Sequence, residues 1–173
     1  MIRNVSIRDA HDIVGIYNNY ILNSAITFET EPLQTDAMGK RISDISAVYP
    51  FLVYELNGKV IGYCYVHQWK ERAAYTGVVE LSIYLSSECV GKGIGTELML
   101  RMIEECRNRK YRVIITCVTG ENNASKALQK KLGFKQVAHF KDIGLKFNRL
   151  IDILYYHADR YLALMLLHST DKW

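Results

Sequence analysis

The sequence has few of the features that mark membrane, disulfide-bonded or metal-binding proteins. It has only two prolines, no apolar run long enough to span a bilayer, and no apolar stretch after Met1 that would indicate a signal peptide. Its four cysteines (Cys64, Cys89, Cys106 and Cys117) form no C-x-x-C pair, and its five histidines show no metal-ligand spacing. We therefore expect a cytoplasmic protein with reduced, buried thiols, no bound metal and no membrane partner.

The charge balance is modest. Lysine and arginine outnumber aspartate and glutamate by 22 to 18, which gives a net charge of +4 spread along the chain. Nucleic-acid binding would require a clustered basic face, so no nucleic-acid partner is predicted. An anionic ligand such as a phosphorylated cofactor remains compatible with this charge. With 173 residues, 49% of them hydrophobic, a single domain over residues 1–173 is expected.

Apolar periodicity predicts an α/β fold (α+β in some schemes), a mixed sheet of about seven strands flanked by about four helices. The strands are expected at residues 2–7, 51–55, 60–66, 78–85, 113–118, 135–140 and 151–156. The helices are expected after Asp9, over about 35–48, from Ile94 to the basic stretch 107–110, and from Asn122 or Asn123 to Gly133. Asn57-Gly58 between two apolar runs predicts a tight hairpin.

The sharpest local motif is Val90-Gly91-Lys92-Gly93-Ile94-Gly95-Thr96, between a predicted strand and a predicted helix. The first N–H groups of a helix lack partners, and glycines let an anion approach them closely. Lys92 and Arg101 add favourable charge. The spacing is G-x-G-x-G, because Thr96 stands where a third Rossmann glycine would fall. The motif predicts a pyrophosphate cradle, with a ligand-free glycine turn as the alternative.

These residues resemble the cofactor loop of the GNAT superfamily of N-acetyltransferases, with Val90 where the family has Gln or Arg. Asn122-Asn123-Ala124-Ser125 and the later Leu132-Gly133-Phe134 resemble its second cofactor element. The resemblance implies the GNAT fold and acetyl-CoA as co-substrate. The cofactor-binding residues it implies are Ile83, Tyr84, Leu85, Gly91, Lys92, Gly93, Ile94, Gly95, Thr96, Asn122 and Lys131.

A narrower resemblance covers residues 1–157. Segments 69–75, 79–85, 28–32 and 144–149 are similar to the phosphinothricin and methionine sulfoximine acetyltransferase branch, although Leu150 stands where that branch commonly has Trp. This likeness implies a small amino-acid-like amine acceptor, and family members often form homodimers. The acceptor-binding residues it implies are Phe28, Lys70, Glu71, Arg72, Tyr75, Glu80, Leu81, Ser82 and Lys146. Residues 158–173 have no counterpart and could form a terminal helix.

Amide formation requires a base for the amine proton. Glu80, flanked by apolar residues, is the predicted base, because partial burial would raise its pKa toward neutrality. The alternative is a solvent-exposed strand glutamate. Tyr84 and Tyr75 are possible proton donors to the leaving thiolate. Other hypotheses are a cationic acceptor (a polyamine or an aminoglycoside), a protein N-terminus, or a module that binds acetyl-CoA without turnover.

Overall fold

A computed structural model describes residues 1–159 and contains the predicted seven strands and four helices. The strands are β1 (Ile2–Asn4), β2 (Phe51–Leu56), β3 (Lys59–Gln68), β4 (Val78–Leu85), β5 (Val113–Thr119), β6 (Lys135–Lys146) and β7 (Arg149–Asp159). The helices are α1 (Ala10–Asn23), α2 (Thr35–Ser46), α3 (Ile94–Asn108) and α4 (Asn123–Lys131). Short 3₁₀ turns, η1 (Ile7–Asp9), η2 (Ala73–Tyr75) and η3 (Ser87–Cys89), connect some of them. Of residues 158–173, where a terminal helix was one expectation, Ala158 and Asp159 belong to β7 instead, and residues 160–173 lie outside the described part.

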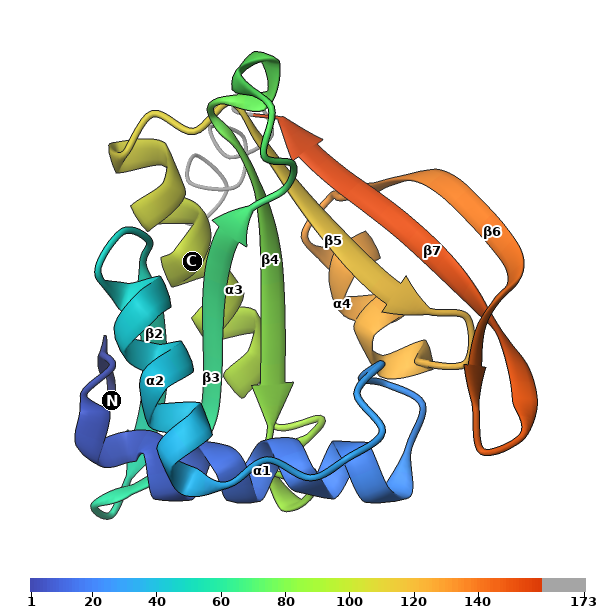
Figure 1. The fold of residues 1–173 in the computed structure, drawn as a ribbon. Coiled ribbons are helices and arrows are strands. Elements are labelled where there is room, and N and C mark those ends of the chain that lie inside the picture. Colours follow the sequence, from blue (N-terminus) through green and yellow to red (C-terminus); the bar gives the residue numbers. More distant parts are fainter. Residues whose placement is uncertain (160–173) are drawn as a thin grey trace.

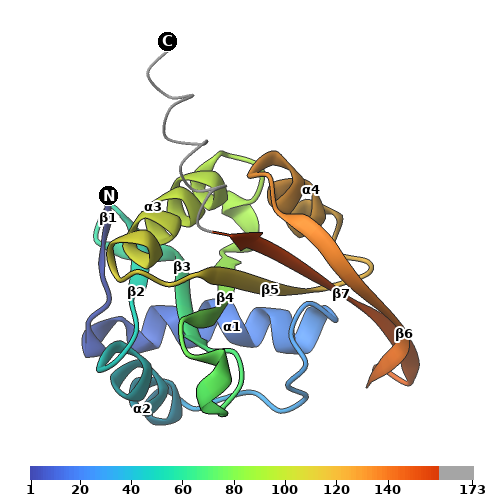
Figure 2. The ribbon, with the colours of Figure 1, turned by 90° about the horizontal axis from the view of Figure 1, so that it is seen from above.

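All seven strands form one sheet in the order β1-β2-β3-β4-β5-β7-β6. Helices α1 and α2 cover one face, and α3 and α4 cover the other (Figures 1 and 2). The alternation of side chains along each strand divides the interior accordingly. Leu98, Met99 and Met102 of α3 pack with one set of strand residues, and Ile13 and Ile21 of α1 pack with the opposite set.

Local chemistry explains where several elements begin and end. Asn57 and Gly58 both have positive φ angles, 52° and 77°, which confirms the predicted β2–β3 turn. The first strand is shorter than predicted, because Ser6 caps η1 in a capping box with Asp9. The carboxylate of Asp9 is also held by Arg3 at 2.8 Å, and it makes no side-chain capping bond to α1.

The last two strands are longer than predicted and form one hairpin. Phe147 and Asn148 turn the chain with φ angles of 52° and 55°, and the pairing runs from Lys146–Arg149 back to Lys135–His157. Exposed residues along β6 weakened its apolar pattern, so the sequence revealed only its first half. In Figure 1 the closed end of this hairpin extends away from the body of the sheet.

The parallel pair β4–β5 positions the site. Their pairing runs from Val78–Val113 to Leu81–Thr116 and stops there, although both strands continue. Figure 1 shows the two strands separating below that point. The main-chain edge of residues 82–85 that faces β5 therefore has no strand partner in the described part of the chain. Ser82 and Cys117 are the first residues on either side of this opening, which we call the β4–β5 gap.

Candidate active site

A cavity of about 550 Å³ lies at the open end of the β4–β5 gap. Its walls come from the free end of β4, the glycine loop with the start of α3, and α4. The lining residues are Tyr20, Ile26, Ile83, Leu85, Ser87, Val90, Gly91, Gly93, Gly95, Thr96, Asn122, Ala124, Ser125, Ala127, Leu128 and Lys131. The structure thus brings together two sequence motifs that lie about 30 residues apart in the chain.

The glycine loop presents open main chain to this cavity. Gly91 and Gly93 have φ angles of 81° and 86°, in the left-handed region that favours glycine. Apart from the adjoining residues of the loop, a Cβ atom built on either glycine would meet no atom of the described residues within 4 Å, so the main chain there is openly accessible. Gly93 is the N-cap of α3 and makes no side-chain cap, which leaves the first N–H groups of the helix for a ligand. A pyrophosphate group fits this cradle.

The other predicted cofactor residues differ in their positions. Lys131 reaches across the cavity and donates a hydrogen bond to Thr96 Oγ1 at 3.3 Å. The side-chain oxygen of Asn122 caps α4 by accepting a hydrogen bond from the main-chain N–H of Ser125 at 3.0 Å. The side-chain NH₂ group of Asn122 is the part that remains able to donate to a coenzyme. Lys92 is exposed, whereas Ile94 is buried in the core and contributes main chain only.

Arg101, which was expected to add charge to the cradle, is instead held within α3. It forms ion pairs with Glu104 at 2.6 Å and with Glu105 at 2.9 Å. Its charge is neutralised on its own helix, because residues three and four positions apart share a helix face.

Glu80 lies two residues before the gap opens, on the sheet face that α1 and α2 cover. It is half-buried, not fully in solvent. Burial raises the pKa of Glu80 above its usual range, and the nearby charges of His67 and Lys70 partly offset this rise. His67 is its cross-strand partner on β3. The carboxyl group is therefore shifted in the direction that a general base at neutral pH requires.

Tyrosine rings form the surface beside Glu80. Tyr84 packs against Tyr17 and Tyr63, with ring centroids 5.1 and 5.3 Å apart. Tyr65 pairs with Ser82 across the strands and is hydrogen-bonded to it. The side chain of Tyr84 is buried among these rings, and burial raises its pKa well above the usual value. It is therefore a weak proton donor for a thiolate.

Lys146 connects the distant β6–β7 hairpin to this tyrosine cluster. The side chain is buried, and its Nζ donates to the Thr27 carbonyl at 2.9 Å, while Thr27 Oγ1 is bonded to the Tyr17 hydroxyl at 2.7 Å. Within residues 1–159, no carboxylate pairs with Lys146. Burial lowers the pKa of its ammonium group, because the charge is only partly compensated. Phe28, beside Thr27, is about half exposed.

The loop between β3 and β4 stays at the surface. Glu71, Arg72 and Tyr75 are exposed, and Tyr75 packs edge-on against Trp69 at 5.1 Å. Lys70 lies over the Trp69 ring and is the one predicted loop residue whose charge acts on Glu80. Leu81, also predicted as an acceptor residue, faces the opposite side of the sheet in the α3 core. Its side chain is therefore directed away from Glu80.

Three residues near the site were not predicted as site residues from the sequence. Arg41 of α2 lies over the Tyr17 ring at 5.4 Å and pairs with Glu29 at 2.7 Å. Cys117 and Tyr155 are cross-strand partners on β5 and β7, on the same sheet face as Glu80. Sequence periodicity could assign each of these residues to a helix or a strand, but it could not predict that the folded chain brings them close to the site.

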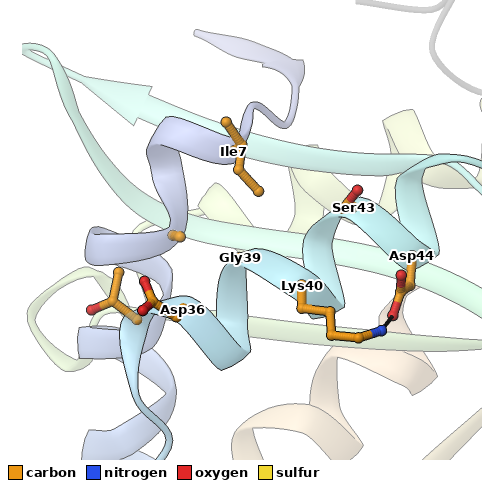
Figure 3. A pocket seen from close by; sticks show the side chains of 8 residues that line it. Ile7, Asp36, Gly39, Lys40, Ser43 and Asp44 are labelled. Carbon is orange, nitrogen blue, oxygen red and sulfur yellow. Dashed lines mark hydrogen bonds and ion pairs between the residues drawn. The ribbon is translucent and has the colours of Figure 1, made fainter.

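A second hollow, of about 440 Å³, lies between η1 and α2 and contains none of the motif residues (Figure 3). Its lysine, Lys40, is already paired with Asp44 at 2.6 Å. Over the described residues 1–159 we find no cluster of His, Cys, Asp and Glu able to hold a metal ion. No helix in that part of the chain is long and apolar enough to cross a membrane.

Comparison with known proteins assigns the family. The model of the acetyltransferase (GNAT) domain matches residues 2–155, so the chain belongs to the GNAT acetyltransferase family. It is an acyltransferase that uses acetyl-CoA as its co-substrate. This confirms the predicted family, fold and cofactor.

Within this family, the chain is similar to phosphinothricin and methionine sulfoximine acetyltransferases. Phosphinothricin N-acetyltransferase from Alcaligenes faecalis is 34% identical over 146 residues, which are 83% of this chain and 74% of that protein. An L-methionine sulfoximine/L-methionine sulfone acetyltransferase from Salmonella typhimurium is 32% identical over 151 residues, 85% and 86% of the two chains. The crystal structure of a phosphinothricin acetyltransferase from Sinorhizobium meliloti in complex with AcCoA has a TM-score of 0.88 at 34% identity, covering 92% of this chain and 87% of that one. The predicted resemblance to this branch is confirmed.

Proposed function

We propose that this enzyme transfers the acetyl group of acetyl-CoA to the primary amine of a small amino-acid-like acceptor, with Glu80 as general base. The observation that carries this proposal is the position of Glu80. A half-buried carboxyl group with a raised pKa lies at the closed end of a gap whose open end is a phosphate cradle. The names of the similar proteins support an acceptor of the phosphinothricin, methionine sulfoximine or methionine sulfone type.

The residues around the cavity are suited to hold the coenzyme along the gap. The main chain of Gly91–Thr96 takes the pyrophosphate, and the unpaired edge of residues 82–85 takes the amides of the pantetheine arm as an added strand would. Bound in this way, the coenzyme supplies an acetyl thioester near Ser82. Main-chain N–H groups of that edge then stabilise negative charge developing on the carbonyl oxygen. Glu80 accepts the amine proton, directly or through one water molecule.

The acceptor approaches from the α1 and α2 face. Lys146 provides a buried ammonium group that pairs with no carboxylate of residues 1–159, and an acceptor carboxylate would complete that pair. Arg72 and Lys70 lie on the surface loop that borders this face, where Arg72 would offer a two-pronged contact to a carboxylate or phosphinate. This arrangement of cations favours an acidic acceptor over a polyamine or an aminoglycoside.

Lys146→Met tests the acceptor side. We expect the KM for the acceptor to rise about 10-fold, because a charge-assisted hydrogen bond contributes roughly 1.5–3 kcal/mol. The affinity for coenzyme A, measured by calorimetry, should stay unchanged. Lys141→Met, on the exposed part of the same strand, is the matched control. An equal loss of acceptor and coenzyme binding would contradict the assignment of Lys146.

A thiol-release assay with a panel of amines tests the function itself. Activity on methionine sulfone, methionine sulfoximine or phosphinothricin supports the proposal. Activity restricted to polyamines, aminoglycosides or peptide N-termini would contradict the amino-acid-like acceptor and identify one of these amines as the acceptor class instead. Coenzyme binding without turnover on any amine would reduce the protein to a binding module.

We also propose that the protein forms a homodimer through the β6–β7 hairpin. β6 is an edge strand of the sheet, and large apolar side chains are exposed along the hairpin: Val137, Phe140, Ile143, Leu145, Phe147 and Leu150. An exposed apolar edge strand pairs readily with a second copy of itself, which would cover both the main-chain edge and the side chains.

Ile143→Lys combined with Leu145→Lys should convert the dimer to a monomer. Two buried lysines at the contact would remain desolvated and unpaired. Sedimentation velocity measures the change. Val48→Lys, which replaces an equally exposed apolar residue on another face, should leave the mass unchanged. A wild-type protein that is monomeric at micromolar concentration would refute the dimer.

A further inference from the structure

We infer that Tyr20 of α1 positions the arm of the bound coenzyme through the main chain of β4, because its hydroxyl holds a carbonyl group that the arm covers. This inference rests on the proposed binding of acetyl-CoA along the β4–β5 gap, and it adds a residue that no motif of the sequence indicates. It depends on which main-chain groups of β4 face the gap and on what already holds them.

The main-chain groups of β4 face the gap at alternate residues. The N–H of Ser86 donates to the carbonyl of Ile61 on β3 at 2.8 Å, so this pair directs its groups toward β3. In an antiparallel ladder the adjacent pair, Leu85 with Gly62, directs its N–H and C=O groups away from the partner strand. The gap lies on that other side, because the pairing of β4 with β5 stops at Leu81. The carbonyl of Leu85 therefore faces the gap.

Tyr20 already holds this carbonyl. Its hydroxyl donates a hydrogen bond to the carbonyl oxygen of Leu85 at 2.7 Å, across 65 residues of sequence. The contact is possible because α1 passes the end of β4 (Figure 1). The Tyr20 ring packs against Tyr84, with centroids 5.6 Å apart. Burial raises the pKa of Tyr20 above its usual value, so at neutral pH the hydroxyl keeps the proton that it donates.

Tyr20 and Leu85 both line the cavity beside the glycine loop. A coenzyme arm that leaves the cradle and enters the gap passes over the Leu85 carbonyl and excludes water from it. A carbonyl that loses water without gaining another donor weakens binding, whereas a carbonyl that is already hydrogen-bonded can be covered without this loss. The Tyr20 hydroxyl thus prepares the outer end of the free β4 edge for the arm, and leaves the N–H groups of that edge to bind it.

Support of the fold is the competing role for Tyr20. Helix α1 is attached to the sheet by fully buried apolar side chains, among them Ile13, Ile16 and Ile21. Tyr20 is only partly buried and packs at the margin of this group. Loss of its hydroxyl alone should therefore leave α1 in place, so the two roles can be separated by measuring binding.

Tyr20→Phe removes the hydroxyl group and keeps the ring beside Tyr84. We expect the dissociation constant of coenzyme A, measured by isothermal titration calorimetry, to rise about 10-fold, because the arm then covers an unpaired carbonyl. The second probe is 3′-phospho-ADP, which carries the pyrophosphate group and lacks the pantetheine arm, and it should bind the variant and the wild type equally. In steady-state kinetics the KM for acetyl-CoA should rise by the same factor, while the acceptor KM stays unchanged.

Tyr49→Phe is the matched control, since Tyr49 is also partly buried and packs against another tyrosine, Tyr111, but does not line the cavity. It should change neither affinity. Equal or tighter binding of coenzyme A by Tyr20→Phe would overturn the inference, because the Leu85 carbonyl would then be left uncovered or be paired by the arm itself. An equal loss of affinity for both probes would also overturn it, because Tyr20 would then support the cavity as a whole.

The wild-type protein separates this inference from the function on which it rests. If it binds no coenzyme A, the proposed function and the inference fail together. If it binds coenzyme A and Tyr20→Phe binds it equally well, only the inference fails.

Discussion

Glu80→Gln should reduce kcat about 100- to 1000-fold at neutral pH and leave coenzyme A binding unchanged. General-base catalysis contributes a factor of roughly 10²–10⁴, and glutamine cannot accept a proton. Glu88→Gln, an exposed residue of η3 next to the cradle, is the matched control and should retain full activity. Steady-state rates with a saturating acceptor measure the effect. A variant with wild-type turnover would remove Glu80 from the mechanism.

The dependence of the reaction rate on pH tests the role of Glu80 as general base independently. The base must be deprotonated to act, so the wild-type rate should rise with pH through the raised pKa of Glu80. This limb should disappear in Glu80→Gln. If the limb persisted in the variant, another group would be responsible for it.

The contribution of Glu80 to folding stability should fall over the pH range in which the reaction rate rises. Because the folded protein holds the Glu80 proton more tightly than the unfolded chain does, the contribution of this residue to stability falls as pH rises from about 4.3 through the raised folded pKa. Above that window its charge is buried at a cost. Glu80→Gln should therefore melt at the same temperature as the wild type or higher at pH 7, as differential scanning calorimetry would show.

Gly93→Ala should weaken coenzyme A binding at least 10-fold. The left-handed backbone at φ 86° disfavours a Cβ atom by about 1 kcal/mol or more, and the added methyl group would project into space that is free of protein. Relaxation of the loop would turn the first N–H groups of α3 away from the pyrophosphate. Isothermal titration calorimetry with coenzyme A measures the loss.

Gly58→Ala is the matched control, because it introduces the same backbone strain as Gly93→Ala at a position that does not contact the coenzyme. Gly58 in the β2–β3 turn also has a positive φ angle, 77°, and open space around its Cβ position, but it lies away from the cavity. Both variants should lose similar stability, and only Gly93→Ala should lose affinity. Equal affinity in the two variants would show that the glycine loop does not hold the coenzyme.

The sequence predicted the position and conformation of the glycine loop well because the signal is local. Gly91 and Gly93 lie within three residues of each other, and their backbone angles and the start of α3 follow from short-range chemistry. The same reasoning predicted the Asn57-Gly58 turn. It overestimated the free charge of Arg101, which its acidic neighbours on α3 neutralise. Lys92 is exposed, and its contact with the coenzyme stays a prediction.

The acceptor side was predicted less completely. The sequence identified Glu80 by its apolar flanks, but its raised pKa depends on partial burial in the folded protein. The family resemblance implied Leu81 as an acceptor residue, yet its side chain lies in the α3 core, because adjacent strand residues point to opposite faces. Lys146 contacts Thr27, 119 residues away, through a hairpin that sequence periodicity only half revealed.

By itself the sequence determined the order of strands and helices, the turns and the glycine loop before α3, because hydrophobic periodicity and turn chemistry act within a few residues. Only the tertiary structure decided that β4 separates from β5 after Leu81 and that Cys117 and Tyr155 lie at that point. Strand order and pairing register decide such neighbours, because they arise from long-range packing that no single segment encodes.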